Sequence, residues 1–311
     1  MRTYCSKKAK VNLSQNKNRQ GYRSSGKGSL KIVGIGPGDI GNISQRAREA
    51  IEGCQVVVGY KTYVRLLGNL VDNKKVISSG MTEEIKRAEY AIENAKSGKK
   101  VCIISSGDPG IYGMAGLVLE LLNKTDLKME PTPRLRRGDA QERNTKAAFI
   151  SGLKGGVFER RSIKIEIIPG IIAATASAAL LGAPLMHDFA VISLSDILTD
   201  LELIKQRVKL AAKADFVIVF YNPKSVKRII PFQRACGILL KHKSPDTPVG
   251  IVRNAYRDNQ EIAVTTLKNM LSFKKIDMAT TIIIGNSKTY IKDKYIITPR
   301  GYNIKPTGGN Q

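Results

Sequence analysis

Short apolar runs alternate with amphipathic segments along most of the chain. The apolar runs are rich in valine and isoleucine, which is typical of buried strands. The segments between them repeat apolar residues every three or four positions, as helices do. We therefore predict strands over residues 31–35, 55–59, 75–78, 101–104, 163–168, 189–194, 215–220, 249–253, 261–265 and 280–285. We predict helices over residues 45–51, 82–96, 114–122, 171–181, 201–212, 226–241 and 267–271.

The alternation of strand and helix predicts the fold class. Strands that are separated by helices pair mainly in parallel, with helices on both faces of the sheet. The pattern of the first half returns in the second, so we expect two α/β domains, 29–185 and 186–300. Loops at the strand ends of both halves should then face each other across a cleft, where ligands commonly bind.

Three segments depart from this alternation. Residues 1–28 are basic and polar with no apolar period, and they predict a disordered tail. Residues 123–162 contain a proline- and arginine-rich stretch and predict an inserted surface loop. Residues 301–311 form a second tail. The basic tail has no apolar stretch of the kind found in a secretory signal, whereas its composition leaves an organelle transit peptide open.

Composition narrows the class of protein. The net charge of +25 favours polyanionic ligands. No apolar run is long enough to span a membrane. The four cysteines form no Cys-x-x-Cys pair and there are two histidines, so we expect no metal site and a cytoplasmic location. Cys54 and Cys102 lie in apolar surroundings and should be buried.

A glycine-rich turn follows the first predicted strand, with glycines at 34, 36 and 38 around Pro37. A dinucleotide-binding loop would need glycine at position 39, where Asp39 stands, and the Gly-Lys-Ser/Thr ending of a phosphate-binding loop is absent. The residues 42–44 can cap the helix that follows. Taken alone, this turn fits a cofactor site and a tight structural turn equally well.

Three separated motifs carry a family resemblance. They are Gly-Ile-Gly-Pro-Gly-Asp at 34–39, Ser-Gly-Asp-Pro-Gly-Ile-Tyr-Gly at 106–113, and Pro-Gly-Ile-Ile-Ala at 169–173 with Gly-Ala-Pro-Leu at 182–185. In this order the chain resembles the tetrapyrrole methylases over residues 29–300, apart from the insertion. The stretches 185–196, 220–225 and 250–255 resemble the branch that methylates C17 of a corrin precursor, precorrin-3B or its cobalt-containing counterpart, and contracts the ring.

The resemblance implies S-adenosylmethionine as cofactor, a polycarboxylated tetrapyrrole as substrate, a cleft between two α/β domains, and a homodimer. Ile172 stands where family members often carry threonine or serine, so it offers no hydroxyl to the cofactor. Asp108 has a structural alternative, since aspartate in such a turn often binds its own backbone. Carried over by motif, the cofactor-binding positions are Gly36, Pro37, Gly107, Asp108, Ile111, Ile172, Ala173, Tyr221, Ala255 and Thr280.

Methyl transfer from a sulfonium needs no protein nucleophile, so positioning should supply most of the acceleration. Ring contraction should also need proton movement, for which Asp39, His187 and Asp188 are candidate acids or bases. Asp39 has the alternative of capping the next helix, and the other two of joining the domains. Basic residues near strand ends could pair with substrate carboxylates or be ordinary surface charges. They are Lys61, Arg65, Lys224 and Arg253.

Two other functions compete with this interpretation. A methyltransferase of the same fold could act on ribosomal RNA, and the positive charge would suit RNA. A non-enzymatic protein could bind nucleic acid through its basic segments. The motifs at 187–189 and 221–223 resemble those of corrin enzymes instead, and the basic segments lack interleaved aromatic residues. We therefore expect neither a nucleic-acid nor a membrane partner.

Overall fold

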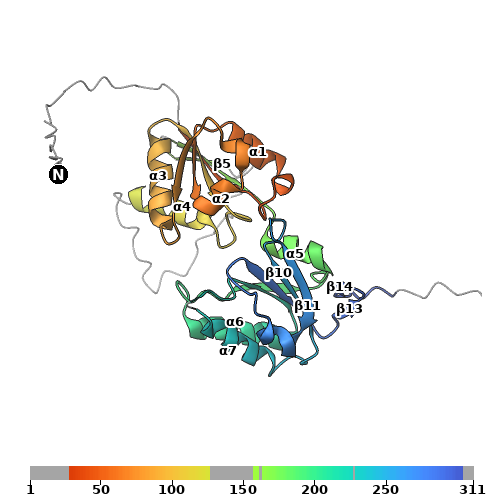
Figure 1. Cartoon of the computed structure of the whole chain (residues 1–311). Helices are drawn as coiled ribbons and strands as arrows, with labels where there is room; N and C mark the ends of the chain where they lie inside the picture. Colours follow the sequence, from red (N-terminus) through yellow and green to blue (C-terminus); the bar gives the residue numbers. More distant parts are fainter. Residues whose placement is uncertain (1–27, 127–156, 161–162, 227, 304–311) are drawn as a thin grey trace, which may run out of the picture.

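The computed structural model describes residues 28–126, 157–160, 163–226 and 228–303. These residues form two α/β units, one built on a six-stranded sheet and the other on a five-stranded sheet (Figure 1). A small three-stranded sheet flanks the second unit. Of the predicted tails, 1–28 and 301–311, residues 1–27 and 304–311 lie outside the described residues, so their conformation stays a prediction, whereas Gly28 belongs to β1.

The first sheet has the strand order β3-β2-β4-β1-β6-β5, and every neighbouring pair is parallel except β5 with β6. β1 lies between β4 and β6, which places the ends of three predicted glycine or proline motifs side by side. The strands are β1 (Gly28–Gly34), β2 (Val56–Tyr60), β3 (Lys75–Ser79), β4 (Lys100–Ser105), β5 (Val157–Arg160) and β6 (Ile163–Ile168).

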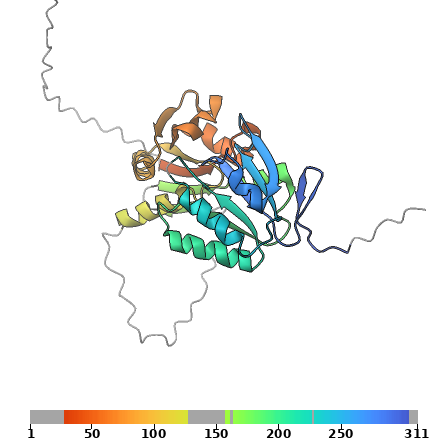
Figure 2. The same ribbon diagram turned by 60° about the horizontal axis from the view of Figure 1, so that its bottom comes forward.

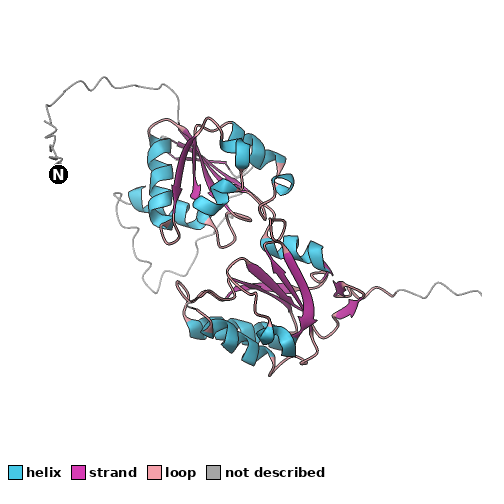
Figure 3. Cartoon of the chain, viewed as in Figure 1, coloured by secondary structure: helices cyan, strands magenta, loops and turns pink. Residues whose placement is uncertain are grey.

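Helices cover both faces of this sheet (Figure 3), because successive side chains of a strand point to opposite faces. Leu30 and Ile32 pack with α3 and α4, whereas Val33 and Ile35 pack with α1 and α2. Ser44 caps α1 by accepting a hydrogen bond from Ala47 N, as the sequence predicted. The helices are α1 (Gln45–Glu52), α2 (Lys61–Arg65), α3 (Glu84–Lys96) and α4 (Met114–Asp126), with 3₁₀ turns η1 (Ile40–Asn42) and η2 (Gly68–Val71). Cys54 and Cys102 are buried, as predicted.

The second sheet has the order β11-β10-β12-β9-β8, and here the prediction of mainly parallel pairing is wrong. Only β8 and β9 pair in parallel. A short connection folds β11 back on β10, and β12 then enters between β10 and β9, antiparallel to both. The strands are β8 (Phe189–Ser193), β9 (Val217–Tyr221), β10 (Pro248–Arg253), β11 (Glu261–Thr266) and β12 (Thr280–Ile284).

α6 (Leu201–Lys213), α7 (Ile230–Leu239) and η3 (Leu267–Ser272) cover one face of the second sheet, and α5 (Ala173–Leu181) covers the other. α5 buries Ala174, Ala178 and Leu181 against this sheet, so the chain crosses between the sheets at residues 169–172. The predicted boundary near 185 falls after that crossing. The third sheet joins β7 (Gly182–Ala183), β14 (Tyr295–Ile297) and β13 (Tyr290–Lys292).

Three predicted elements have different limits in the structure. The helix expected from residue 226 begins at Ile230, beside Pro231, because proline suits the first turn of a helix. The helix expected at 267–271 is the 3₁₀ turn η3. The predicted loop 123–162 contributes its first residues to α4 and residues 157–160 to β5, and its middle lies outside the described residues. No helix among the described residues has both the length and the apolar character to cross a membrane.

Candidate active site

Three turns meet at the carboxyl ends of the first sheet. Gly36 and Gly107 exchange two backbone hydrogen bonds, of 3.2 and 2.8 Å, and so join the turns after β1 and β4. A Cβ atom on Gly170 would lie 2.2 Å from the Gly107 carbonyl oxygen, and one on Gly34 would lie 2.6 Å from the same oxygen. Gly34 and Gly170 are therefore needed for backbone packing, which is the structural alternative for such glycines.

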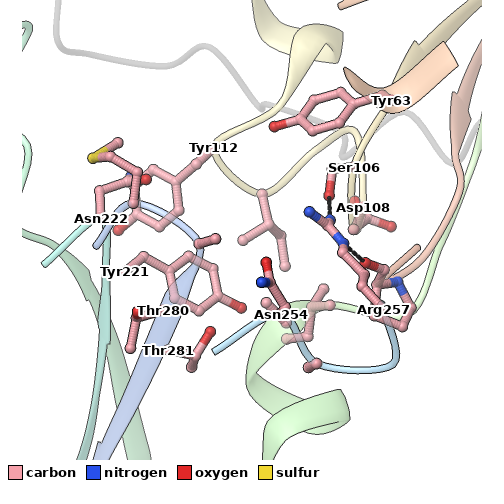
Figure 4. Close-up of a pocket in the computed structure, with 18 residues that line it drawn as sticks. Tyr63, Ser106, Asp108, Tyr112, Tyr221, Asn222, Asn254, Arg257, Thr280 and Thr281 are labelled. Carbon is pink, nitrogen blue, oxygen red and sulfur yellow. Dashed lines mark hydrogen bonds between the residues drawn. The ribbon is translucent and has the colours of Figure 1, made fainter. Parts of the chain in front are cut away.

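A cavity opens between these turns and the strand ends of the second sheet (Figure 4). Residues from both units line it, and nine of the ten predicted cofactor positions are among them. Those nine are Pro37, Gly107, Asp108, Ile111, Ile172, Ala173, Tyr221, Ala255 and Thr280. Gly36 is the exception: its φ is +69°, and a Cβ atom there would lie 2.8 Å from the Asn42 carbonyl oxygen, so a side chain would strike the backbone rather than the cavity.

Sequence reasoning missed half of the cavity wall. Ser106, Asn222 and Asn254 directly follow strands β4, β9 and β10, so the strand-end rule could have found them. Arg257 lies in the connection between β10 and β11 and carried no signal. The full set of additional lining residues is Tyr63, Ser106, Tyr112, Asn222, Asn254, Arg257, Met278, Ala279 and Thr281.

Arg257 links the two units at the cavity wall. Its Nε donates to the Pro37 carbonyl oxygen, and its Nη2 donates to Ser106 Oγ at 3.0 Å (Figure 4). Burial lowers the pKa of the guanidinium below its usual value, and burial also raises the pKa of the neighbouring Tyr63 phenol. One partly desolvated cation thus holds both glycine-containing turns against the second unit.

Tyr221 meets the start of α5. Its Oη accepts a hydrogen bond from Ala174 N at 2.7 Å, and Ile172, the N-cap residue, supplies no side-chain cap. Burial raises the pKa of Tyr221 to about 12, so the phenol keeps its proton at neutral pH. The ring of Tyr112 packs edge-on at 5.9 Å, and its Oη donates to the Val191 carbonyl oxygen at 3.2 Å. Tyr221 therefore contributes one neutral hydroxyl near the cavity.

Asp108 and Thr280 are largely occupied within the protein. Asp108 accepts from Gly110 N at 2.7 Å and from Gly170 N at 3.1 Å, so it joins two of the turns, as its structural alternative suggested. Thr280 Oγ1 donates to Asp277 Oδ1 at 3.1 Å. Thr281 differs: it is 6% exposed, it lines the cavity, and its hydroxyl bonds to no residue that the structure describes. A ligand polar group would satisfy it.

The structure does not bring the three candidate acids and bases to this cavity. Asp39 is exposed and accepts a hydrogen bond from Asn42 Nδ2 at 3.1 Å. His187 and Asp188 precede β8, whereas the cavity lies at the other end of that strand. They line a separate hollow instead. Their predicted role in proton transfer has no support from this placement, because a direct proton transfer requires hydrogen-bond reach of the reacting atoms.

The basic residues expected to meet substrate carboxylates are also absent from the cavity wall. Arg253 is held by Asp277 at 2.8 Å and by Glu261 at 3.6 Å, and these carboxylates raise the pKa of its guanidinium. Lys61, Arg65 and Lys224 do not line the cavity. Within the described ranges no three metal-ligating side chains gather at one point.

The cavity lies between two α/β units, is bounded by glycine turns at strand ends and has no phosphate-binding loop. This arrangement is that of a cofactor-binding transferase. The profile of the tetrapyrrole (corrin/porphyrin) methylases matches residues 29–133 and 155–271, and the chain belongs to this family. Members of the family use S-adenosylmethionine and act on tetrapyrroles.

Individual relatives agree with this family. A cobalt-factor III methyltransferase of Priestia megaterium is 48% identical over 281 residues, which are 90% of this chain but 46% of that longer protein. A probable cobalt-factor III C(17)-methyltransferase of Salmonella typhimurium is 44% identical over 88% of this chain and 100% of its own length. The crystal structure of the methyltransferase CobJ superimposes with a TM-score of 0.70 at 29% identity, covering 88% of this chain and all of that one.

Proposed function

We propose that this chain methylates C17 of a corrin precursor with S-adenosylmethionine and contracts the ring, in cobalamin biosynthesis. The cobalt-containing precursor, cobalt-factor III, is favoured over precorrin-3B because the two curated relatives above are named for it. The observation that carries the proposal is the single cavity to which the three family motifs contribute. The alternative substrate, ribosomal RNA, draws no support from this cavity.

The cavity wall fits the cofactor. Thr281 is a buried residue whose hydroxyl lacks a partner among the described residues and faces the cavity. A Cβ atom on Gly107 would meet no atom closer than 3.9 Å, so packing leaves open space there, and a ligand can approach the backbone. The lining mixes apolar groups with a few hydroxyls and amides, and it has no phosphate-binding loop, which suits a nucleoside cofactor without phosphates.

When bound, S-adenosylmethionine supplies an electrophilic methyl group on a sulfonium. The lining residues include no cysteine and no histidine, so the chain acts by holding its ligands in line and by limiting water. Arg257 fixes the turns that carry Pro37 and Ser106, and the Tyr221 ring closes the side of the cavity next to α5. With Asp39, His187 and Asp188 elsewhere, Tyr221 is the lining phenol whose hydroxyl can donate a hydrogen bond to the substrate, because Tyr112 Oη already donates to the Val191 carbonyl oxygen.

The test incubates the full chain with S-adenosylmethionine and either cobalt-factor III or metal-free precorrin-3B. We expect a product that is heavier by one methyl group, with the absorption spectrum of a contracted ring. Failure with both substrates would contradict the C17 assignment. Thr281→Val is the matched variant, because it removes the hydroxyl at nearly constant volume. It should raise the KM for S-adenosylmethionine about five- to tenfold, since a neutral hydrogen bond contributes about 1 kcal/mol.

The homodimer also stays a proposal carried over from the family. Sedimentation velocity of the full chain would show a species of twice the mass of the 34.1 kDa chain if it is correct. A single 34.1 kDa species at micromolar concentration would count against it.

A further inference from the structure

A second hollow, of about 410 Å³, lies at the opposite end of the second sheet from the cavity. Its walls come from the segments before β8 and β9 and after β12 and β14, and all of them belong to the second unit or its flanking sheet. This volume lies in the range typical of small-molecule sites. The lining residues are His187, Asp188, Ala214, Asp215, Phe216, Asn286, Ser287, Lys288, Pro299, Arg300 and Gly301.

The acidic wall of the hollow is already occupied. Asp215 accepts hydrogen bonds from Ser287 Oγ at 2.6 Å, from Ser287 N at 3.0 and 3.2 Å, and from the buried Lys243 Nζ at 3.2 Å. Although burial opposes it, this set of donors lowers the pKa of the carboxyl group below its usual range. Asp215 is thus a fixed, charge-balanced part of the wall rather than an open acceptor.

Asn286, a buried residue, supplies a donor with no partner. Its side chain is 6% exposed, and its Oδ1 accepts from Lys288 N and from Thr289 Oγ1, each at 3.0 Å. These two bonds fix the amide group and leave Nδ2 without a hydrogen bond to any residue the structure describes. This N–H group is held in a fixed position and is free to donate to a ligand acceptor in the hollow.

The remaining polar groups around Asn286 are mainly donors. His187 Nδ1 accepts from Asp188 N at 2.9 Å, so Nε2 is the ring nitrogen left to donate. Lys288 and Arg300 are exposed at the rim, and neither side chain has a carboxylate partner within the described part of the chain. Asp188, also exposed, lies 3.8 Å from His187 and is the one open carboxylate in the lining.

We propose that this hollow binds a small anion through carboxylate or phosphate oxygens, with Asn286 Nδ2 as the fixed donor and Lys288 and Arg300 as the charged partners. An oxyanion presents mainly acceptors, which matches a wall in which Asp188 is the one open carboxylate. The inference is independent of the methyl-transfer proposal, because no lining residue is shared with the cavity.

The test uses the full-length, ¹⁵N-labelled protein, titrated at low salt with inorganic phosphate in one arm and with succinate in the other. The side-chain amide signal of Asn286 is assigned by its disappearance in Asn286→Asp. We expect this signal to shift with millimolar saturation in at least one arm, and the stronger arm identifies the anion chemistry. No shift in either arm up to about 50 mM, at which a site with a dissociation constant of about 1 mM is about 98% occupied, would overturn the proposal.

Three variants distinguish specific anion binding in the hollow from general electrostatic attraction of anions to a basic protein. Asn286→Asp keeps the Oδ1 acceptor of the turn but replaces the donor by a negative charge, so binding should fall at least tenfold while the melting temperature is retained. Arg300→Gln should weaken binding about three- to tenfold, as expected for losing one charge-assisted bond. Lys292→Gln, on strand β13 outside the hollow, removes the same charge and should change binding less than 1.5-fold. Equal losses in Arg300→Gln and Lys292→Gln would refute the proposal.

Discussion

The two ends of strand β8 face two different sites. Ser193, at its carboxyl end, donates from its backbone N–H to Tyr112 Oη. Tyr112 belongs to the first unit and lines the cavity between the two units, here the cleft. His187 and Asp188, before its amino end, line a hollow built by the second unit and its flanking sheet. A continuous motif, 185–196, thus runs from one site to the other (Figure 2 shows the second unit from another side). Residues of one continuous sequence motif therefore line the same site only where they lie at the same end of the strand.

The cleft differs from the hollow most in how its backbone is packed, and Gly170→Ala tests this difference. The added Cβ atom would lie 2.2 Å from the Gly107 carbonyl oxygen and 2.8 Å from the Gly34 carbonyl carbon, so three turns must move apart. We expect the free energy of unfolding to fall by about 3 kcal/mol, the upper range for overpacking. Urea unfolding followed by far-UV circular dichroism measures it.

Gly116→Ala is the matched control for this change. Gly116 lies in α4, and a Cβ atom there has no neighbour within 4 Å. Alanine should therefore stabilise the protein by up to about 1 kcal/mol, because it is the better helix former. If Gly170→Ala proved as stable as Gly116→Ala, the backbone-to-backbone packing of the cleft would be incorrect.

Arg257 is the second point at which the two regions differ, because it joins both units whereas the hollow needs only one. Arg257→Lys keeps the charge but cannot make the two bonds to Pro37 and Ser106 with one geometry. We expect the dissociation constant for S-adenosylmethionine to rise about tenfold, equivalent to about 1.4 kcal/mol. Isothermal titration calorimetry measures it.

Arg46→Lys makes the same exchange away from both regions. Arg46 pairs with the buried Glu166 within the first unit and lines neither the cavity nor the hollow. Its cofactor affinity should match that of the parent protein within about twofold. A similar loss in both variants would mean that Arg257 acts only through general stability.

The features of the fold and the site that the sequence predicts correctly are those that depend on local interactions. The cap at Ser44 and the turns that follow β1 and β4 depend on residues close in sequence. The cap was predicted correctly, and both strands end within one residue of the predicted position. The entry of β12 between β9 and β10 and the packing of α5 on the second sheet depend on long-range burial, and apolar periodicity does not specify a partner. Arg257 was missed because its two acceptors lie 151 and 220 positions away.

The titration of Tyr221 tests whether its side chain is buried in the cleft. A folded-state pKa of about 12, against 10.0 for the free phenol, means that the neutral form is favoured by folding. The associated stability is fully present below pH 10 and is lost as pH rises through about 12. In Tyr221→Phe this part of the alkaline loss should disappear, and the stability at pH 8 should fall by about 1 kcal/mol, because Ala174 N loses its acceptor. Absorbance at 295 nm follows the phenolate, and a parent-minus-variant titration with its midpoint near 10 would contradict the burial of Tyr221.

The smallest expected effects come from the two ends of β8 itself. Tyr112→Phe removes the hydroxyl that accepts from Ser193 N and donates to the Val191 carbonyl oxygen, so it loosens the cleft at one end of the strand. We expect kcat to fall about threefold to fivefold, equivalent to about 0.7 to 1 kcal/mol, which lies in the range for neutral hydrogen bonds. His187→Gln changes the other end, where the side chain meets the hollow, and kcat should change at most about twofold. Steady-state methyl transfer with each variant decides between the two ends. A larger loss of kcat in His187→Gln than in Tyr112→Phe would support a catalytic role for His187. It would contradict the assignment of methyl transfer to the cleft alone.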